Sequence, residues 1–255
     1  MRRALLAVFS LVFASSAVYL AWLPDVSFYK RHNPTTTAFI ELQKARLGKK
    51  FRPRLLWTPW NEISDNLKHA VLVSEDDMFY QHGGVDWDAV RVAFAKDWEQ
   101  KRLAYGASTI TQQVARNLYL SPSKNPLRKL KELLIARRLE HDLGKRRIFE
   151  LYLNIAEWGK GVYGCGAAAR AYFNKSCSDL SVDESVALAV VLPSPRRHDP
   201  SKPGKYVARN SARIMTRMRM SGFLPDEDGE TFIAPSTPTV IGPMVPGETP
   251  SAVLQ

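Results

Sequence analysis

An uncharged apolar segment, residues 4–23 (ALLAVFSLVFASSAVYLAWL), follows Met1-Arg2-Arg3 at the start of the chain. Its length suffices to cross a lipid bilayer once as a helix. The two arginines predict that residues 1–3 stay in the cytoplasm and that the rest of the chain lies in the periplasmic or extracytoplasmic space. Small residues at 14–17 also fit a signal peptide that is cleaved. Because the apolar run continues to Leu23, we favour an uncleaved single-pass anchor in the cytoplasmic membrane.

The balance of charge requires an anionic partner or surface. The chain has 36 Lys and Arg against 25 Asp and Glu, a net charge of +11. Nucleic acid, anionic lipid and a phosphorylated substrate would all satisfy that excess. The apolar anchor and the lack of a groove-reading motif argue against nucleic acid.

The two cysteines, Cys165 and Cys177, do not form a disulfide framework or a metal-binding pattern. In an exported protein they could pair with each other. Two buried, unpaired thiols are an equally good interpretation.

The chain divides into an anchor, a connector, a body and a tail. Residues 24–50 have the composition of a connector with a basic end, and residues 225–255 form a Pro- and Gly-rich tail that we expect to be flexible. The body between them, residues 51–224, has no internal repeat. We expect its segments to be irregular or a short strand at 55–62, a helix on a membrane surface or in the core at 85–103, and helices at 125–143, 145–158, 167–172, 183–192 and 208–222.

Glu75 stands where a short helix meets the motif VSEDDMFYQHGG, residues 73–84. Leu67, Ala70 and Val71 mark one apolar face, and adding four residues to Val71 gives Glu75. A carboxyl group there meets the negative end of the helix dipole in a partly dry environment, and both effects raise its pKa. Such a group suits proton transfer. An ordinary polar helix end is the alternative.

Two further segments could bind anions. Thr109 and Gln112 in GASTITQQ, residues 106–113, fit a capping box after a glycine loop, where an anionic or sugar group can bind. Asn125-Pro126 predicts the start of a helix that carries many Lys and Arg residues and few acids. This basic helix could bind an anion or could simply be solvated.

Glu75 and Glu150, with the basic helix between them in the sequence, indicate chemistry at a sugar. One carboxylate can move a proton while the other manages charge at the anomeric carbon. A basic helix suits an anionic leaving group such as a diphosphate. The pattern therefore favours glycosyl transfer from a lipid-linked sugar diphosphate over hydrolysis of a neutral polysaccharide.

The chain resembles the monofunctional biosynthetic peptidoglycan transglycosylases, the glycosyltransferases that also form the first module of bifunctional penicillin-binding proteins. The resemblance covers roughly residues 51–220. Its motifs are EDxxFxxHxG at 75–84, GGSTITQQ at 106–113 with Ala107 in place of a glycine, RKxxE at 128–132, KxxILExYLN at 145–154 with Phe149 in place of a leucine, the glycine-rich stretch at 159–175 and a proline-containing motif at 188–195.

The resemblance implies a mainly α, lysozyme-like fold with a larger head and a smaller, membrane-facing jaw. It implies that Glu75 is the general base that deprotonates the sugar 4-hydroxyl of lipid II. That hydroxyl attacks C1 of the growing lipid-linked chain in one inverting step, which forms a β-1,4 link and releases undecaprenyl diphosphate. Glu150 would assist that departure or hold a divalent cation, Mg or Mn, and no organic cofactor is expected.

The family motifs also supply candidate site residues and partners. Lipid II, the growing glycan chain, the inner membrane and other cell-wall synthesis or division proteins are the expected partners. His82 is expected to be structural, since the family scheme needs no histidine base. The candidate substrate contacts are Ser108, Thr109, Gln112, Arg116, Arg128, Lys131 and Asn154, and the site-shaping candidates are Asp76, Phe79, His82 and Glu132.

Two short matches to penicillin-binding serine enzymes are expected to be accidental. Residues 121–124 fit SxxK and residues 64–66 fit SDN, but their order is reversed and no KTG occurs. We therefore expect no transpeptidase activity. A lytic enzyme on the same polymer and an inactive scaffold are the remaining alternatives; a lytic enzyme would not need the basic helix.

Overall fold

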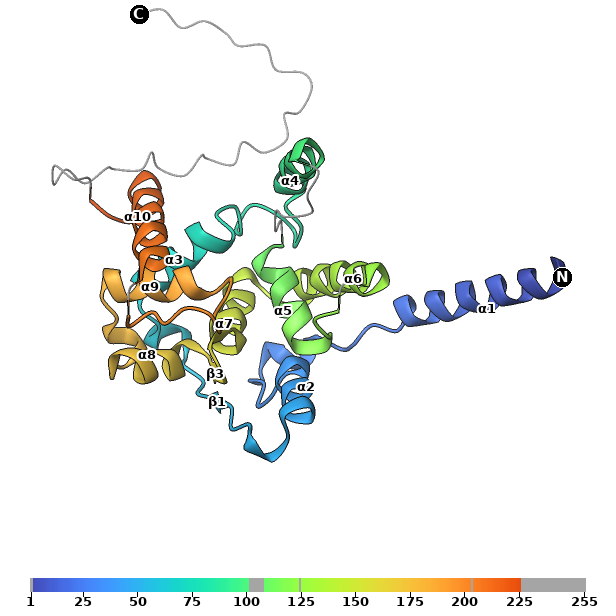
Figure 1. The fold of residues 1–255 in the computed structure, drawn as a ribbon, viewed down its shortest axis with the longest axis horizontal. Helices are drawn as coiled ribbons and strands as arrows, with labels where there is room; N and C mark the ends of the chain where they lie inside the picture. Colours follow the sequence, from blue (N-terminus) through green and yellow to red (C-terminus); the bar gives the residue numbers. More distant parts are fainter. Residues whose placement is uncertain (1, 101–107, 124, 203, 226–255) are drawn as a thin grey trace, which may run out of the picture.

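The computed structural model describes residues 2–100, 108–123, 125–202 and 204–225 and is mainly helical, as predicted (Figure 1). Residues 101–103 of one predicted helix, 106–107 of the glycine loop and 226–255 of the tail lie outside these ranges. The helices are α1 (Arg2–Ala21), α2 (Ala38–Leu47), α3 (Asp65–Glu75), α4 (Trp87–Gln100), α5 (Ile110–Tyr119), α6 (Pro126–Asp142), α7 (Lys145–Ile155), α8 (Cys165–Phe173), α9 (Val182–Val191) and α10 (Lys205–Met220), and the strands are β1 (Arg54–Leu55), β2 (Glu157–Gly159) and β3 (Val162–Tyr163).

Local capping chemistry sets several helix boundaries. The Asn125 side chain accepts a 2.8 Å hydrogen bond from the backbone N–H of Leu127, so α6 begins at Pro126, as its sequence predicts. The prediction of one helix over 145–158 is wrong at its end. Helix α7 stops at Ile155 because residues 157–159 form strand β2, which pairs antiparallel with β3.

Two groups of helices build the core. Helices α3, α9 and α10 pack together, as do α5, α6 and α7. One buried apolar cluster contains residues from both groups, including Val71 of α3, Val114 of α5, Ile148 of α7 and Leu188 of α9. The predicted division into a head and a jaw is not confirmed.

A small sheet joins the start of the body to the segment after α7. Strand β1 runs parallel to β3, with Arg54 opposite Val162. Gly164 follows β3 with a φ of 83°, and a Cβ atom there would lie 2.8 Å from the backbone oxygen of Asn154. Only glycine fits this turn without strain.

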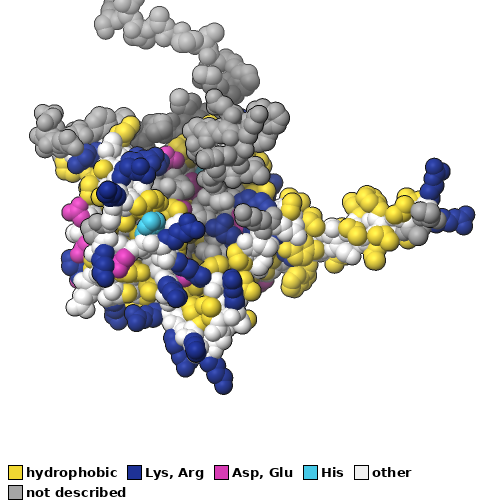
Figure 2. Space-filling view, in the orientation of Figure 1, with side chains coloured by type: hydrophobic (Ala, Val, Ile, Leu, Met, Phe, Trp, Pro, Cys, Tyr) yellow, Lys and Arg dark blue, Asp and Glu magenta, His cyan; other side chains and the backbone are white. Residues whose placement is uncertain are grey.

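Helix α1 extends away from the body, and its apolar side chains face outwards (Figures 1 and 2). Leu5 and Phe9, for example, are 68% and 70% exposed. Within the described ranges, no helix combines the length and the apolar content needed to cross a bilayer, so the predicted transmembrane helix is not confirmed.

The segment predicted as a connector, residues 24–50, is folded against the body. It contains α2, whose N-cap Thr37 accepts a 3.1 Å hydrogen bond from the N–H of Ile40. Arg147 of α7 donates hydrogen bonds to the carbonyl oxygens of Tyr29 and His32 at 2.8 and 2.9 Å. Helix α2 was not predicted, because its apolar residues lack a helical period.

Helix α4 lies apart from the core. Trp87 and Val92 are 62% and 53% exposed, and none of the described side chains of α4 joins the buried cluster. This placement disfavours a plain core helix. A helix on a membrane surface stays a prediction.

Cys165 and Cys177 are both buried and unpaired. Burial raises the pKa of the Cys165 thiol well above its usual value. Of the two interpretations of the sequence, the structure agrees with buried free thiols.

Candidate active site

Glu75 is the last residue of α3 and is partly buried, as its spacing from Val71 predicts. Burial raises the pKa of its carboxyl group; a hydrogen bond from Gln113 and the charge of Arg116 act in the opposite direction but are smaller. A carboxyl group whose pKa is raised in this way accepts a proton more readily than an ordinary exposed carboxylate.

Gln113 of α5 holds the Glu75 carboxylate. Its Nε2 donates a 2.8 Å hydrogen bond to Glu75 Oε2, and its Oε1 accepts a 3.3 Å hydrogen bond from the Tyr152 hydroxyl of α7. The hydroxyl thereby fixes which way the amide points. Our sequence reasoning selected Gln112 and missed Gln113. The sequence carries no signal that separates these two adjacent glutamines, because the choice depends on how α5 packs on α3 and α7.

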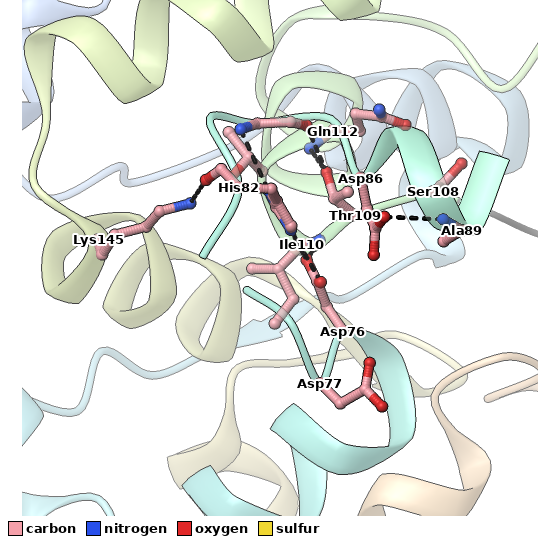
Figure 3. Close-up of polar contacts among 12 residues, drawn as sticks. Asp76, Asp77, His82, Asp86, Ala89, Ser108, Thr109, Ile110, Gln112 and Lys145 are labelled. Carbon is pink, nitrogen blue, oxygen red and sulfur yellow. Dashed lines mark hydrogen bonds and ion pairs between the residues drawn. The ribbon is translucent and has the colours of Figure 1, made fainter. Parts of the chain in front are cut away.

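Asp76 ties the motif around Glu75 to the start of α5 (Figure 3). Its carboxylate accepts hydrogen bonds from the backbone N–H of Ile110 at 2.9 Å and from His82 Nε2, also at 2.9 Å. His82 Nδ1 accepts from the N–H of Gly84, so the proton of the neutral ring is on Nε2. Asp76 and His82 thus position the segment; they do not face Glu75 as a second acid or base.

Thr109 is the N-cap residue of α5 and is hydrogen-bonded to the same loop as Asp76 and His82. Its hydroxyl accepts a 3.2 Å hydrogen bond from the N–H of Gln112 and donates a 2.7 Å hydrogen bond to the carbonyl oxygen of Gly84. Lys145 of α7 adds a 2.6 Å hydrogen bond to the carbonyl oxygen of His82 (Figure 3). The predicted N-cap is confirmed, but the full capping box is not found, because the Gln112 side chain points towards Lys129.

Phe79 lies beneath the same loop. It is fully buried, its ring centroid is 5.6 Å from that of Phe149, and Lys145 Nζ lies 4.4 Å from its ring centroid. The ring anchors the loop to α7, which agrees with a site-shaping role.

Lys129 of α6 connects the start of α5 to the buried part of α6 through hydrogen bonds. Its Nζ donates to Ser108 Oγ at 3.1 Å, to Gln112 Oε1 at 3.0 Å and to Glu132 Oε1 at 2.6 Å. Glu132 is fully buried and also pairs with Arg128. Two cations thus share one carboxylate, and the cluster keeps a net positive charge. Lys129 lies in the RKxxE motif but was not among the predicted contacts.

Arg116 lies one turn of α5 beyond Gln112 and Gln113. Its charge acts on both Glu75 and Tyr152. In the part of the chain that the structure describes, no carboxylate forms an ion pair with Arg116. It is therefore a cation that an anionic substrate could use.

A cavity of about 170 Å³ lies next to Glu75. Helix α10 lines it with polar side chains that repeat at three- and four-residue spacing, and Arg217 among them is held 2.7 Å from Asp77 Oδ2. The sequence predicts a helix over residues 208–222, but we assigned it no site residue. The polar residues that line the cavity with Glu75 are Ser74, Tyr206, Asn210, Arg213 and Arg217.

Glu150 and Asn154 lie elsewhere on α7. The Glu150 carboxylate accepts from the backbone N–H of Trp60 at 3.0 Å and pairs with Arg147 at 2.7 Å. Because residues two apart on a helix point about 200° apart, Glu150 and Tyr152 project to nearly opposite sides of α7. The structure therefore does not bring Glu150 to Glu75 as a carboxylate pair.

The Asn154 side chain is buried, and its amide group forms hydrogen bonds with backbone groups. Its Oδ1 accepts from the N–H of Thr58 at 2.7 Å, and its Nδ2 donates to the carbonyl oxygens of Thr58 and Glu150, both at 2.9 Å. These bonds leave it a role in joining α7 to the segment after β1. The predicted contact with substrate gains no support.

Lys131 is also distant from the Glu75 network. Its Nζ lies 3.9 Å from the ring centroid of Tyr19, near the end of α1. The structure therefore places it beside the N-terminal helix and not beside Ser108 and Gln112, the residues with which it was predicted to act.

The described residues contain no group of three or more acidic, histidine or cysteine side chains that could hold a metal ion. Both oxygens of Glu150 already have partners. The protein side chains around Glu150 do not fit a metal site on their own.

Comparison with known proteins agrees with the geometry. Residues 43–219 match the transglycosylase family. The chain is 41% identical over 222 residues to a biosynthetic peptidoglycan transglycosylase of Chromobacterium violaceum, which covers 86% of this chain and 97% of that protein. It is 44% identical over 206 residues to the protein of that name from Aromatoleum aromaticum, covering 79% and 89% of the two chains. The corresponding protein of Bordetella pertussis is 41% identical over 226 residues, covering 86% and 93%.

Proposed function

This chain belongs to the transglycosylase family, and we propose that it polymerises peptidoglycan glycan chains from lipid II, with Glu75 as the general base. One observation carries the assignment. Glu75 is a carboxyl group with a raised pKa, it is held by the Gln113 amide, and it opens onto a polar cavity. A base of that kind can take the proton of a substrate hydroxyl that enters the cavity and comes within hydrogen-bond reach of it.

In this reaction one proton is transferred, one bond to C1 forms and one bond to C1 breaks. Glu75 takes the proton of the sugar 4-hydroxyl of one lipid II molecule. The resulting oxygen attacks C1 of the lipid-linked chain as the bond from C1 to the diphosphate oxygen breaks. The electron pair of that bond leaves with undecaprenyl diphosphate, and the configuration at C1 inverts to give a β-1,4 link.

Cations on α5 and α6 support the departure of the diphosphate in this proposal. Arg116 has no ion pair among the described side chains, and Lys129 belongs to a cluster with more cations than anions. Ser108 adds a hydroxyl to that cluster. We assign Arg116 and Ser108 the strongest substrate contacts, because the Ser108 hydroxyl accepts from Lys129 and keeps its own proton to donate. Lys129 supplies charge from within the cluster, and the hydroxyl of Thr109 and the side-chain amide oxygen of Gln112 already have partners in the protein.

The same proposal places the enzyme at the cell envelope, anchored by residues 4–23 in the inner membrane with a single crossing and a periplasmic body. The apolar side chains exposed along α1 support attachment to lipid. Carbonate extraction of membranes from cells that make the full chain, or the chain without residues 1–23, tests the attachment. Release of the full chain into the supernatant would contradict it.

Polymerisation of purified lipid II by the full chain in detergent tests the activity. We expect wild-type protein to form glycan polymer and Glu75→Gln to lose at least ~100-fold in rate, since a general base contributes about that much. Glu62→Gln is the matched control, because Glu62 is exposed and lies outside the site. Cleavage of preformed glycan without consumption of lipid II would overturn the proposal in favour of a lytic enzyme.

Penicillin binding gives a second, independent check. The proposed enzyme is monofunctional, since no KTG motif accompanies the SxxK match at residues 121–124. We expect no covalent labelling by a fluorescent penicillin, whether Ser121 is present or replaced in Ser121→Ala.

A further inference from the structure

A second cavity, of about 490 Å³, lies where α1 meets the body. Aromatic side chains from both sides line it, Tyr19 and Trp22 from the anchor segment and Tyr119 from α5. Two cations of α6, Arg128 and Lys131, also line it. The cavity therefore combines apolar walls with positive charge.

Lys131 is a buried cation that pairs with no anion among the described residues. The residue is 5% exposed, and its Nζ lies 3.9 Å from the ring centroid of Tyr19 and 5.2 Å from that of Trp22. No hydrogen bond or ion pair to it occurs in the described part of the chain. Contacts with aromatic faces offset only part of the cost of taking an ammonium group out of water. An anionic ligand would offset the rest.

The position of the cavity indicates where that anion comes from. The apolar part of α1 ends at Tyr19 and Trp22, and tyrosine and tryptophan are typical of the headgroup level of a membrane. If α1 is the anchor, the cavity lies at the level of the phospholipid phosphates. We propose that it binds an anionic phospholipid, with Lys131 and Arg128 at the phosphate and the aromatic rings against the glycerol and upper acyl chains.

The proposed lipid is distinct from the substrate. Arg128 donates to the buried Glu132, and the other oxygen of Glu132 accepts from Lys129, which also donates to Ser108 on the active-site side. Glu132 therefore separates the cavity from the Glu75 network. The inference rests on the proposed attachment of α1 to the membrane, but it does not depend on catalysis.

The test measures which lipid stays with the protein. Full-length protein is inserted into vesicles of phosphatidylcholine and phosphatidylglycerol, extracted in mild detergent and purified, and the bound lipids are quantified by mass spectrometry. We expect phosphatidylglycerol to be enriched over phosphatidylcholine. Lys131→Gln should reduce that enrichment by about fivefold, the effect of one cation at an anionic membrane surface. Arg137→Gln, an exposed site on the same helix, removes the same charge and should not reduce it.

Several outcomes would overturn the proposal. Equal losses in Lys131→Gln and Arg137→Gln would show general attraction by the net charge, and no loss in either would show no lipid site at Lys131. Displacement of phosphatidylglycerol by undecaprenyl phosphate would assign the cavity to the substrate. If Lys131→Gln does not fold, Lys131→Arg must keep the enrichment and Trp22→Leu must reduce it. Failure of the full chain to enter phosphatidylcholine vesicles would refute the membrane attachment itself, separately from the lipid site.

Discussion

Gln113 of α5 donates a 2.8 Å hydrogen bond to Oε2 of Glu75, at the end of α3. The bond stabilises the ionised form of a carboxyl group whose burial favours the neutral form. Gln113 is thus a positioning residue that sets both the direction and the basicity of the proposed base.

Replacing Gln113 should move the pH dependence of polymerisation. Without the donor, the pKa of Glu75 rises further, so the acidic limb of the rate profile moves to higher pH in Gln113→Leu. At neutral pH the rate should fall by about tenfold, as expected for a lost hydrogen bond to a charged group. Initial rates of lipid II polymerisation across pH measure this. Gln81→Leu, at an exposed position, is the control; an unmoved acidic limb in Gln113→Leu would contradict the role given to Gln113.

The raised pKa of Glu75 also predicts that ionisation of this carboxyl group lowers the stability of the folded state. A carboxyl group whose pKa is higher in the folded state than in the unfolded state holds its proton better when folded. Its ionisation therefore costs nothing below the unfolded pKa of about 4.3 and destabilises the fold increasingly as pH rises through the folded pKa. Glu75→Gln should be more stable than wild type at pH 7, by about 1 kcal/mol or roughly 2–4 °C in Tm.

Thermal unfolding at several pH values measures that gain. The stabilisation by Glu75→Gln should disappear at about pH 3, below the unfolded pKa, where Glu75 is protonated in both states. Glu62→Gln should show no such trend, because Glu62 is exposed. A gain that is independent of pH would mean that ionisation of Glu75 is not its cause.

Sequence patterns predicted the parts of this site that depend on neighbours along the chain. The spacing from Val71 placed Glu75 on the buried side at a helix end, and Thr109 and Asn125 act as N-caps where their residue types predict them. Each of these depends on contacts within four residues, which periodicity and capping preferences describe.

Contacts between distant segments could not be predicted in this way. Gln113 meets Glu75 across 38 residues, and Asn154 meets Thr58 across 96 residues. Lys131 shares its helix face with apolar residues, yet α1 determines its surroundings. Which of two adjacent glutamines faces the base depends on how α5 packs on α3 and α7, and one helix's own periodicity does not contain that information.

Breaking the buried Glu132 cluster should cost stability. Glu132 is fully buried and pairs with Arg128 and Lys129, so Glu132→Gln leaves two cations without their shared anion. We expect a loss of about 3 kcal/mol in the free energy of unfolding, measured in urea. Glu41→Gln, which breaks an exposed pair with Lys44, should cost less than about 1 kcal/mol. Equal costs for the two variants would contradict this account of Glu132.

Glu150 allows a sharp test of the expected divalent cation. We expect chelation by EDTA to slow polymerisation and added Mg²⁺ or Mn²⁺ to restore it. Because the Glu150 carboxylate is held by Trp60 and Arg147, Glu150→Gln should need the same metal concentration for half-maximal rate as wild type. A variant that needs about tenfold more metal would instead identify Glu150 as a ligand, since losing one ligand interaction costs at least that much affinity.

Arg213 of α10 should affect substrate binding more than the chemical step. It lines the cavity beside Glu75, and no carboxylate in the described ranges pairs with it. A charge-assisted hydrogen bond to an anionic group of the glycan that does not change charge during the reaction would be equally strong in the ground state and in the transition state. Arg213→Gln should therefore raise KM for lipid II by roughly tenfold and leave kcat within about twofold.

Arg209→Gln, exposed on the same helix and outside the cavity, controls for net charge. A fall in kcat with unchanged KM would instead place Arg213 at the reacting centre, and equal effects of the two variants would show that only the overall charge of α10 matters.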